Sequence, residues 1–204
     1  MQTKTIVFAT KNAGKLKEIR AIMADAPYGV ISMSEAGLDI DVVEDGDTFE
    51  ANALKKATEI AQACGKIVLS DDSGLEIDYL DKAPGVLSAR YMGEDTPYVV
   101  KNTAILEKLN GVPEDKRTAR FVSVIAAAIP TPTGMETLTA RATIEGIIGY
   151  EIKGENGFGY DPIFFVPEHG MTTAEMPPAL KNEISHRGKA LRAMRDLLLQ
   201  KAGL

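Results

Sequence analysis

The chain has 204 residues, of which 45% are hydrophobic, so it is long enough to bury one substantial core and to form one or two domains. Its net charge of −6 argues against general nucleic-acid binding, which requires a basic face. No stretch approaches the ~20 apolar residues of a membrane span, and the single cysteine, Cys64, excludes an internal disulfide. These features predict a cytoplasmic protein that binds neither nucleic acid nor membrane.

The first third of the chain alternates between strand and helix patterns. The apolar run Thr5–Ala9 predicts a buried strand, and the helical spacing of the apolar residues after it predicts a helix from about Ala13 to Asp25. Asp47 and Glu50 have the spacing of a capping box and predict the start of a second helix, which Gly65 should end.

The middle of the chain predicts two strands and a helix. "KIVLS" is typical of a buried strand, "DDSG" of a turn and "LEIDYL" of another strand. Val99, Leu106 and Leu109 predict the apolar face of a third helix, ended by Asn110 and Gly111.

Two paired strands and a last helix are predicted in the remaining part. "ARFVSVIAAAI" and "ETLTARATIEG" should pair across a turn from Pro130 to Gly134, and the second alternates between apolar and polar residues, so one of its faces should be buried. Ser185 is a good N-cap for the last helix. Because no linker divides the chain, we expect a single α/β domain over residues 1–204 with a mixed sheet.

The stretch "FATKNAGKLKEI" contains a loop between a strand end and a helix start. It lacks the spacing of a P-loop, since Leu16 follows Gly14-Lys15 where a P-loop has Ser or Thr. Backbone N–H groups at a helix N-terminus nevertheless favour anions, and Lys15 adds a positive charge. The loop therefore predicts phosphate binding, with an ordinary loop and a solvated lysine as the alternative.

Acidic residues gather in two places. Asp71 and Asp72 should lie at a sheet end, with their side chains on opposite sides, so that only one enters a site directly. Hard carboxylate oxygens near a phosphate loop predict Mg²⁺, and Glu44 supplies a further acid. Asn52 and Lys56 share a helix face. The alternatives are turn-capping acids and a solvated helix face.

Aromatic and basic residues gather near the C-terminus. Phe158 and Tyr160, flanked by glycines, could stack on a base or form a turn that tucks into the core. Lys181, His186 and Arg187 lie around a helix start, where His and Arg are good hydrogen-bond donors, although a lone His near a cap is often structural.

Six motifs in order cover nearly the whole chain: "TKNAGK", "ANALKKA", "SDDSGLEID", "APGVLSARY", "FGYDPIFF" and "SHRGKAL". Together they resemble the inosine triphosphate pyrophosphatase family, whose members hydrolyse deaminated purine nucleoside triphosphates such as dITP, ITP and XTP. The resemblance implies an α/β fold with an elongated mixed β-sheet flanked by helices, and two lobes with a substrate cleft between them. It also implies a homodimer and Mg²⁺-dependent release of pyrophosphate.

The resemblance further implies a role for each matching position. Triphosphate contacts are implied for Thr10, Lys11, Asn12, Ala13, Gly14, Lys15, Lys56 and Ser73. The base and sugar-phosphate pocket is implied for Phe158, Gly159, Tyr160, Asp161, Lys181, His186 and Arg187. Glu44 and Asp72 match the metal-side acids, and Asp72 also matches the proton acceptor. The departure is Ala51, where the family commonly has Glu.

Two alternatives remain open. Maf-like pyrophosphatases share the opening loop type but prefer other nucleotides, and the "SHRG" and "FGYD" motifs argue against them. A non-catalytic nucleotide sensor would need the phosphate and base sites but would have no reason to combine Glu44 with Asp72.

Overall fold

The computed structural model describes residues 5–24, 26 and 28–202. The strands are β1 (Thr5–Ala9), β2 (Gly29–Ser32), β3 (Val68–Ile77), β4 (Thr118–Thr131), β5 (Gly134–Ile148), β6 (Phe164–Val166) and β7 (Met171–Thr172). The α-helices are α1 (Ala13–Ile22), α2 (Phe49–Cys64), α3 (Tyr98–Lys108), α4 (Pro178–Ile184) and α5 (His186–Ala202). Short 3₁₀ helices lie at Asp78–Leu80, Gly85–Leu87, Glu114–Lys116, Asp161–Ile163 and Pro167–His169. Within the described residues, no helix combines the length and the apolar character needed to cross a bilayer.

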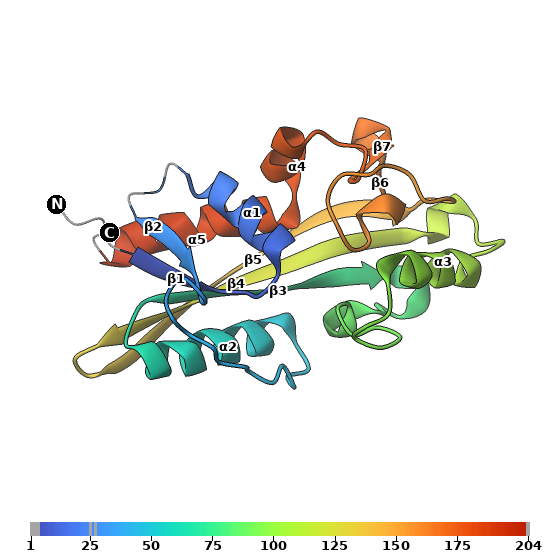
Figure 1. Cartoon of the computed structure of the whole chain (residues 1–204). Coiled ribbons are helices and arrows are strands. Elements are labelled where there is room, and N and C mark those ends of the chain that lie inside the picture. Colours follow the sequence, from blue (N-terminus) through green and yellow to red (C-terminus); the bar gives the residue numbers. More distant parts are fainter. Residues whose placement is uncertain (1–4, 25, 27, 203–204) are drawn as a thin grey trace. The chain divides into compact units, whose positions relative to one another are not determined.

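The strands form one seven-stranded sheet in the order β2-β1-β3-β4-β5-β6-β7 (Figure 1). Strand β1 pairs in parallel with β2 and β3, whereas β6 pairs antiparallel with β5 and β7. Parallel neighbours need a crossover connection, and α1 and α2 provide these connections. The prediction of an α/β fold with a mixed sheet and flanking helices is therefore confirmed, while the elongated outline and the substrate cleft stay predictions.

The chain divides into two compact units. Unit 1 comprises Met1–Asp72, Ser123–Ala142 and Arg187–Leu204, and unit 2 comprises Ser73–Val122 and Thr143–His186. Each unit is assembled from separated segments, so neither corresponds to one continuous stretch of sequence. The prediction of a single functional domain over residues 1–204 stays a prediction.

In unit 1, helices α1 and α5 cover one face of the strands and α2 covers the other (Figure 1). Phe8 of β1 and Leu69 of β3 pack against Ile19 of α1 and Leu191 of α5 in one hydrophobic core. On the opposite face, α2 buries small side chains such as Ala57, which allow its backbone to approach the strands closely.

In unit 2, α3 packs onto the strand ends. Its residues Ile105 and Leu109 share a core with Leu75 of β3 and Phe164 of β6. The Phe121 ring lies 4.4 Å from the Phe164 ring, centroid to centroid. The short elements β2, β6, β7 and α4 were missed in the sequence, because segments of this length carry little periodicity.

The predicted turn at "DDSG" is wrong. Strand β3 runs unbroken from Val68 to Ile77, and Asp71, Asp72 and Gly74 are buried within it. The turn residues Asp and Gly are overridden here because partners from the helices compensate the buried carboxylates, as described below. The strand predicted at "LEIDYL" ends at Ile77, where a 3₁₀ helix begins.

Three helix predictions also need correction. Thr48, not Asp47, caps α2, because its hydroxyl accepts a hydrogen bond from the Ala51 N–H at 3.1 Å. Helix α1 ends at Ile22 instead of Asp25, which lies outside the described residues. On α3, Val99 is 61% exposed and does not belong to the buried face.

The turn predicted from Pro130 to Gly134 is shorter in the structure, because β4 continues to Thr131 and β5 begins at Gly134. Several other element predictions hold. Strand β1, the β4–β5 pairing, the left-handed C-cap at Gly65 and the start of α5 after Ser185 are confirmed.

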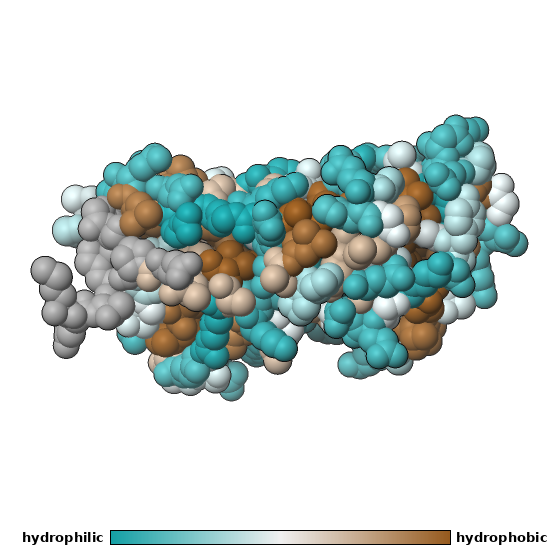
Figure 2. Space-filling view, turned by 90° about the horizontal axis from the view of Figure 1, so that it is seen from above, coloured by the Kyte–Doolittle hydropathy of each residue, from teal (hydrophilic) through white to brown (hydrophobic). Residues whose placement is uncertain are grey.

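Most of the visible face in Figure 2 is hydrophilic, with apolar residues in separate patches.

Arg117 holds several backbone segments of unit 2 together. Its side chain is almost fully buried, and it donates to the carbonyl oxygens of Ile148 and Leu109, each at 2.7 Å, and also to that of Gly149. The guanidinium carbon lies 4.3 Å from the centre of the Tyr150 ring. One side chain thus satisfies three buried or partly buried carbonyl groups.

We expect Arg117→Met to lower the free energy of unfolding by about 3 kcal/mol, because a similar volume remains but the three carbonyls lose their donor. Urea denaturation at neutral pH measures the change. Lys116→Met, at the exposed neighbouring position, is the control and should stay within about 0.5 kcal/mol of the wild type. An Arg117→Met protein as stable as this control would contradict the assigned role.

Candidate active site

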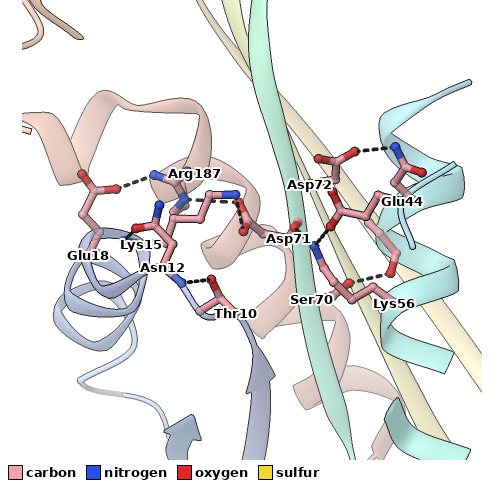
Figure 3. Close-up of polar contacts among 12 residues, drawn as sticks. Thr10, Asn12, Lys15, Glu18, Glu44, Lys56, Ser70, Asp71, Asp72 and Arg187 are labelled. Carbon is pink, nitrogen blue, oxygen red and sulfur yellow. Dashed lines mark hydrogen bonds and ion pairs between the residues drawn. The ribbon is translucent and has the colours of Figure 1, made fainter. Parts of the chain in front are cut away.

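Two adjacent carboxylates form the centre of the candidate site in unit 1. Asp71 is 1% exposed and Asp72 is 7% exposed, and both belong to β3. Because side chains alternate along a strand, Asp71 points toward α1 and α5 while Asp72 points toward α2 (Figure 3). The predicted opposite orientation is confirmed, although the pair lies inside the strand and not at a turn.

Asp71 is surrounded by positive charge. The Lys15 ammonium lies 2.9 Å from its Oδ1, and the Arg187 Nε lies 3.4 Å from its Oδ2 (Figure 3). Burial alone would raise the pKa of Asp71, but the charges of Lys15, Arg187 and Lys56 hold that pKa well below its usual value. Asp71 is therefore a permanent anion that fixes cations from two helices.

Arg187 is the second residue of α5 and is also held by a second acid. Its Nη1 contacts a carboxylate oxygen of Glu18, which lies one turn beyond Lys15 on α1. The guanidinium, only 3% exposed, is thus fixed between Glu18 and Asp71. Sequence reasoning missed Glu18, and the only available signal was its spacing of three residues from Lys15 on one helix face.

Asp72 has a different environment on the other face of β3. The Asn52 amide donates to its Oδ2 at 3.1 Å, and the Asn52 Oδ1 accepts the Gly46 N–H at 2.7 Å. Asn52 is 1% exposed, so the alternative of a solvated helix face is wrong for this residue. A side chain at Gly46 would place its Cβ 2.8 Å from the Asn52 Oδ1, so glycine keeps this arrangement possible.

The carboxyl of Asp72 binds its proton unusually tightly. Burial, followed by the nearby negative charge of Glu44, raises its pKa from 3.8 to about 6, while Lys15, Asn52 and Lys56 oppose the shift. At neutral pH this group is mostly ionised and is a stronger base than an ordinary aspartate. Such a carboxylate can accept a proton from water.

Lys56 connects the two sides of the site. Its ammonium contacts Glu44 and donates to the backbone carbonyl of Asp71 at 2.9 Å. Lys56 and Glu44 are both partly buried. The cation is thereby held beside β3 by one charged and one neutral acceptor.

The residues Glu44 and Asp72 suit a hard cation. Among the described residues there is no cluster of three or more His, Cys, Asp or Glu side chains that could hold a metal by itself. Mg²⁺ usually binds through one or two carboxylates together with substrate phosphates and water, rather than in an all-protein cage. Two oxygen donors whose charges already interact therefore fit Mg²⁺ bound jointly with a phosphate.

The opening loop is shaped for an anion at the start of α1. The Thr10 hydroxyl accepts the Asn12 N–H at 3.1 Å, and the Asn12 side chain accepts the Lys15 N–H at 2.9 Å, which makes Asn12 the N-cap. Ala13 and Gly14 form the first turn, where N–H groups have no acceptor within the helix. Their dipoles attract negative charge.

Lys11 is placed differently from Lys15. It is exposed and lies 3.3 Å from Asp41 and 3.8 Å from Asp39, two almost fully exposed acids. Exposed pairs of this kind contribute little to stability. Ser73, the remaining residue assigned to the triphosphate, follows Asp72 in β3 and is half-buried.

The other assigned residues lie in unit 2. Asp161 accepts the Phe158 N–H at 2.8 Å and the Thr173 hydroxyl at 2.8 Å, and forms a buried ion pair with Lys181 at 2.7 Å. A Cβ at Gly157 would lie 2.2 Å from the Asp161 Oδ2. The loop from Gly157 to Asp161 is therefore folded tightly around one carboxylate.

The two aromatic residues of this loop differ in exposure. Tyr160 is 3% exposed, donates to the Ser88 carbonyl at 2.7 Å and belongs to the core, as the alternative of a tucked-in turn predicts. Phe158 is half-buried, and the Lys181 ammonium lies 5.1 Å from its ring centre. Phe158 is thus the better candidate for stacking, and the substrate role of Tyr160 stays a prediction.

His186 packs flat against an aromatic ring of unit 2. Its ring lies 4.9 Å from the ring of Phe121, with 18° between the planes. Phe121 belongs to β4, so the orientation of the imidazole is set by the sheet.

The sequence from residue 6 to residue 197 matches the model of the Ham1 family. The chain belongs to the Ham1 family. It is 48% identical to a dITP/XTP pyrophosphatase of Desulforamulus reducens over 95% of this chain and 94% of that one. A dITP/XTP pyrophosphatase of Bacillus subtilis is 45% identical, over 96% and 97% of the two chains.

Solved structures of Ham1 proteins have the same fold. The Staphylococcus aureus Ham1 protein has a TM-score of 0.85 and 41% identity, and covers 97% of this chain and 100% of its own. A HAM1 protein from Coxiella burnetii has a TM-score of 0.86 and 39% identity over the same shares. Membership of the Ham1 family confirms the resemblance drawn from the six sequence motifs, while the individual site residues stay predictions.

The opposite environments of the two aspartates in this Ham1-family chain predict opposite effects on stability. Asp71→Asn should lower the free energy of unfolding by about 3 kcal/mol, because Arg187 and Lys15 lose a buried counter-charge. Asp72→Asn should raise it by about 1 kcal/mol at pH 7, because a buried charge that repels Glu44 disappears.

The pH dependence follows from the sign of the Asp72 shift. A raised folded-state pKa penalises the ionised carboxylate above about 6, and the penalty disappears as pH falls toward 3.8. The gain from Asp72→Asn should therefore shrink between pH 7 and pH 4 in urea titrations with EDTA. Asp95→Asn, at an exposed position, is the control. Equal destabilisation by both variants would contradict the two environments.

Proposed function

We propose that this Ham1-family chain hydrolyses noncanonical purine nucleoside triphosphates (dITP, ITP and XTP) to the nucleoside monophosphate and pyrophosphate. The observation that carries the proposal is the pair of buried aspartates on β3, with cations fixed around Asp71 and an acid beside Asp72. The names of the relatives and the order of the six motifs support it.

The triphosphate is assigned to unit 1. Three phosphates carry about four negative charges, which repel an attacking water until cations neutralise them. Lys15 and Lys56 are held in place by Asp71 and Glu44, so their charges need little reorganisation when substrate binds. The first turn of α1 adds backbone N–H groups for the same anion.

We propose Mg²⁺ as the cofactor, with Glu44 and Asp72 as its protein ligands. Bound there, the ion would neutralise charge on the phosphate oxygens and on the pyrophosphate leaving group. The two hard oxygen donors support this choice.

Asp72 is the proposed proton acceptor. A water oxygen forms a bond to the α-phosphorus while the bond from that phosphorus to the bridging oxygen breaks and pyrophosphate leaves. Asp72 orients this water and takes its proton, which its burial and the nearby negative charge of Glu44 favour. The hydrogen bond from Asn52 holds the carboxylate in place.

The purine is assigned to unit 2. Phe158 offers a partly exposed ring for stacking, which is sequence-tolerant because every base has a π face. Hypoxanthine and xanthine carry a carbonyl at C6, whereas adenine carries an amino donor, so a donor such as His186 would favour the first two. The family resemblance implies the same role for Arg187, which belongs to unit 1 and forms ion pairs with Glu18 and Asp71.

We further propose a cytoplasmic homodimer. The resemblance to the inosine triphosphate pyrophosphatase family supports the dimer, and large exposed apolar residues of unit 2, such as Leu87, Met92 and Val99, offer surface for it. The single cysteine fits a reducing compartment.

The direct test is to incubate the protein with ITP and Mg²⁺ and to measure pyrophosphate. We expect release by the wild type, loss of activity in EDTA, and a fall of about 10²-fold or more in Asp72→Asn, which keeps the shape but removes the base. Asp95→Asn is the control. Binding of ITP without pyrophosphate release would favour a sensor, and preference for a pyrimidine triphosphate would favour the Maf-like alternative.

Base choice gives a second prediction. His186→Phe keeps a ring against Phe121 but removes the donor, so the ratio of kcat/KM for ITP over ATP should fall by about tenfold or more. Phe158→Ala should lower both values together, because stacking does not distinguish purines. A folded His186→Phe enzyme that keeps its full ratio would show that discrimination resides elsewhere.

A further inference from the structure

We propose that Asn102 of α3 is a positioning residue that holds the loop from Gly157 to Asp161 and thereby sets the affinity for the purine. This rests on the proposed function, in which Phe158 of that loop stacks on the base. Asn102 does not itself touch the substrate in this proposal.

The connection is a hydrogen bond over a long sequence separation. The Asn102 Nδ2 donates to the carbonyl oxygen of Gly159 at 3.1 Å. Asn102 is 2% exposed, so water competes little for this bond. Gly159 has a φ of +70°, in the left-handed region that glycine adopts readily, and the bond fixes one of the several conformations open to this flexible residue.

The oxygen of the Asn102 side-chain amide indicates that the hydrogen bond to Gly159 is the reason for an asparagine at this position. The Asn102 Oδ1 is buried and has no hydrogen-bond partner within the described residues. Exchanging the amide nitrogen and oxygen would place two acceptors against each other at Gly159, so the donor must face the loop. A buried acceptor left unpaired costs stability, and an apolar side chain would avoid that cost. Packing alone therefore does not explain an amide at this position.

A second contact from α3 supports the same loop. The ring of Tyr98 meets the ring of Tyr160 edge-to-face, with centroids 5.2 Å apart. A Cβ at Gly159 would lie 3.6 Å from the Tyr98 ring. The Lys101 ammonium, 4.9 Å from the centre of the Tyr98 ring, donates to the Ala89 carbonyl at 2.7 Å.

The hydrogen bond from Asn102 to Gly159 acts on a loop that Asp161 also holds. Asp161 closes the loop by accepting the Phe158 N–H and pairing with Lys181. Gly159 lies between Phe158 and Tyr160, so displacement of its carbonyl would reorient the ring proposed to stack on the base. Asp161 thus fixes the backbone at Phe158, and Asn102 fixes the backbone at Gly159.

Amide hydrogen exchange tests whether Asn102 holds the loop, and it does not require a measurement of enzyme activity. In Asn102→Leu, peptides covering residues 155–163 should exchange at least about threefold faster than in the wild type. Thr103→Val is the matched control, because the Thr103 hydroxyl donates to the Val99 carbonyl of the same helix and to no other group of the described residues. Asn102→Ala serves as the second variant if the leucine disturbs folding. Unchanged exchange of the loop in a folded Asn102 variant would overturn the proposal.

Steady-state kinetics test the consequence for the base. The KM for ITP should rise about tenfold in Asn102→Leu while kcat changes less than about twofold, and the Ki of inorganic tripolyphosphate, which has no base, should not change. A parallel rise of KM and Ki would overturn the proposal, because it would indicate a general structural defect. A wild type that does not hydrolyse ITP would overturn the proposed function and the effect on purine affinity, whereas hydrogen exchange would still decide whether Asn102 holds the loop.

Discussion

Asp71 and Asp72 are neighbours in β3 and both are almost fully buried, so each carboxylate must be compensated by the helix layer that it faces. Asp71 is compensated by full charges, Lys15 of α1 and Arg187 of α5. Asp72 is compensated mainly by a neutral amide, that of Asn52 in α2. The strand thereby separates a permanent anion from a proton-binding carboxylate over the distance of a single residue.

This arrangement has a structural cost that a purely stabilising core would avoid. Fixing Lys15 and Arg187 around Asp71 requires buried ion pairs, whose desolvation offsets much of their attraction. Keeping Asp72 close to Glu44 places like charges together in a partly dry environment. In the proposed function, a bound polyphosphate and a divalent cation would offset both costs, so the two features support the proposed catalytic role of the site.

Several parts of the fold could be predicted from sequence because they depend on local chemistry. The apolar run of β1, the left-handed cap at Gly65 and the start of α5 after Ser185 each depend on a few neighbouring residues. The strand interior at Asp71 and Asp72 could not be predicted, because turn-forming residues were kept in a strand by partners from three different helices. Gly46 and Asn52 show the same limit, since their contact forms only when α2 docks.

The sequence alone determined the family, the α/β class and the alternation that sends adjacent aspartates to opposite faces, because motif order and strand periodicity are properties of the chain itself. The tertiary structure decided which aspartate is paired with cations and which has a raised pKa. It also decided that Tyr160 is buried while Phe158 is partly exposed, and that Asn102 holds the Gly159 carbonyl. Burial, charge proximity and hydrogen bonding between distant segments arise only when the elements pack together, so no local pattern could specify them.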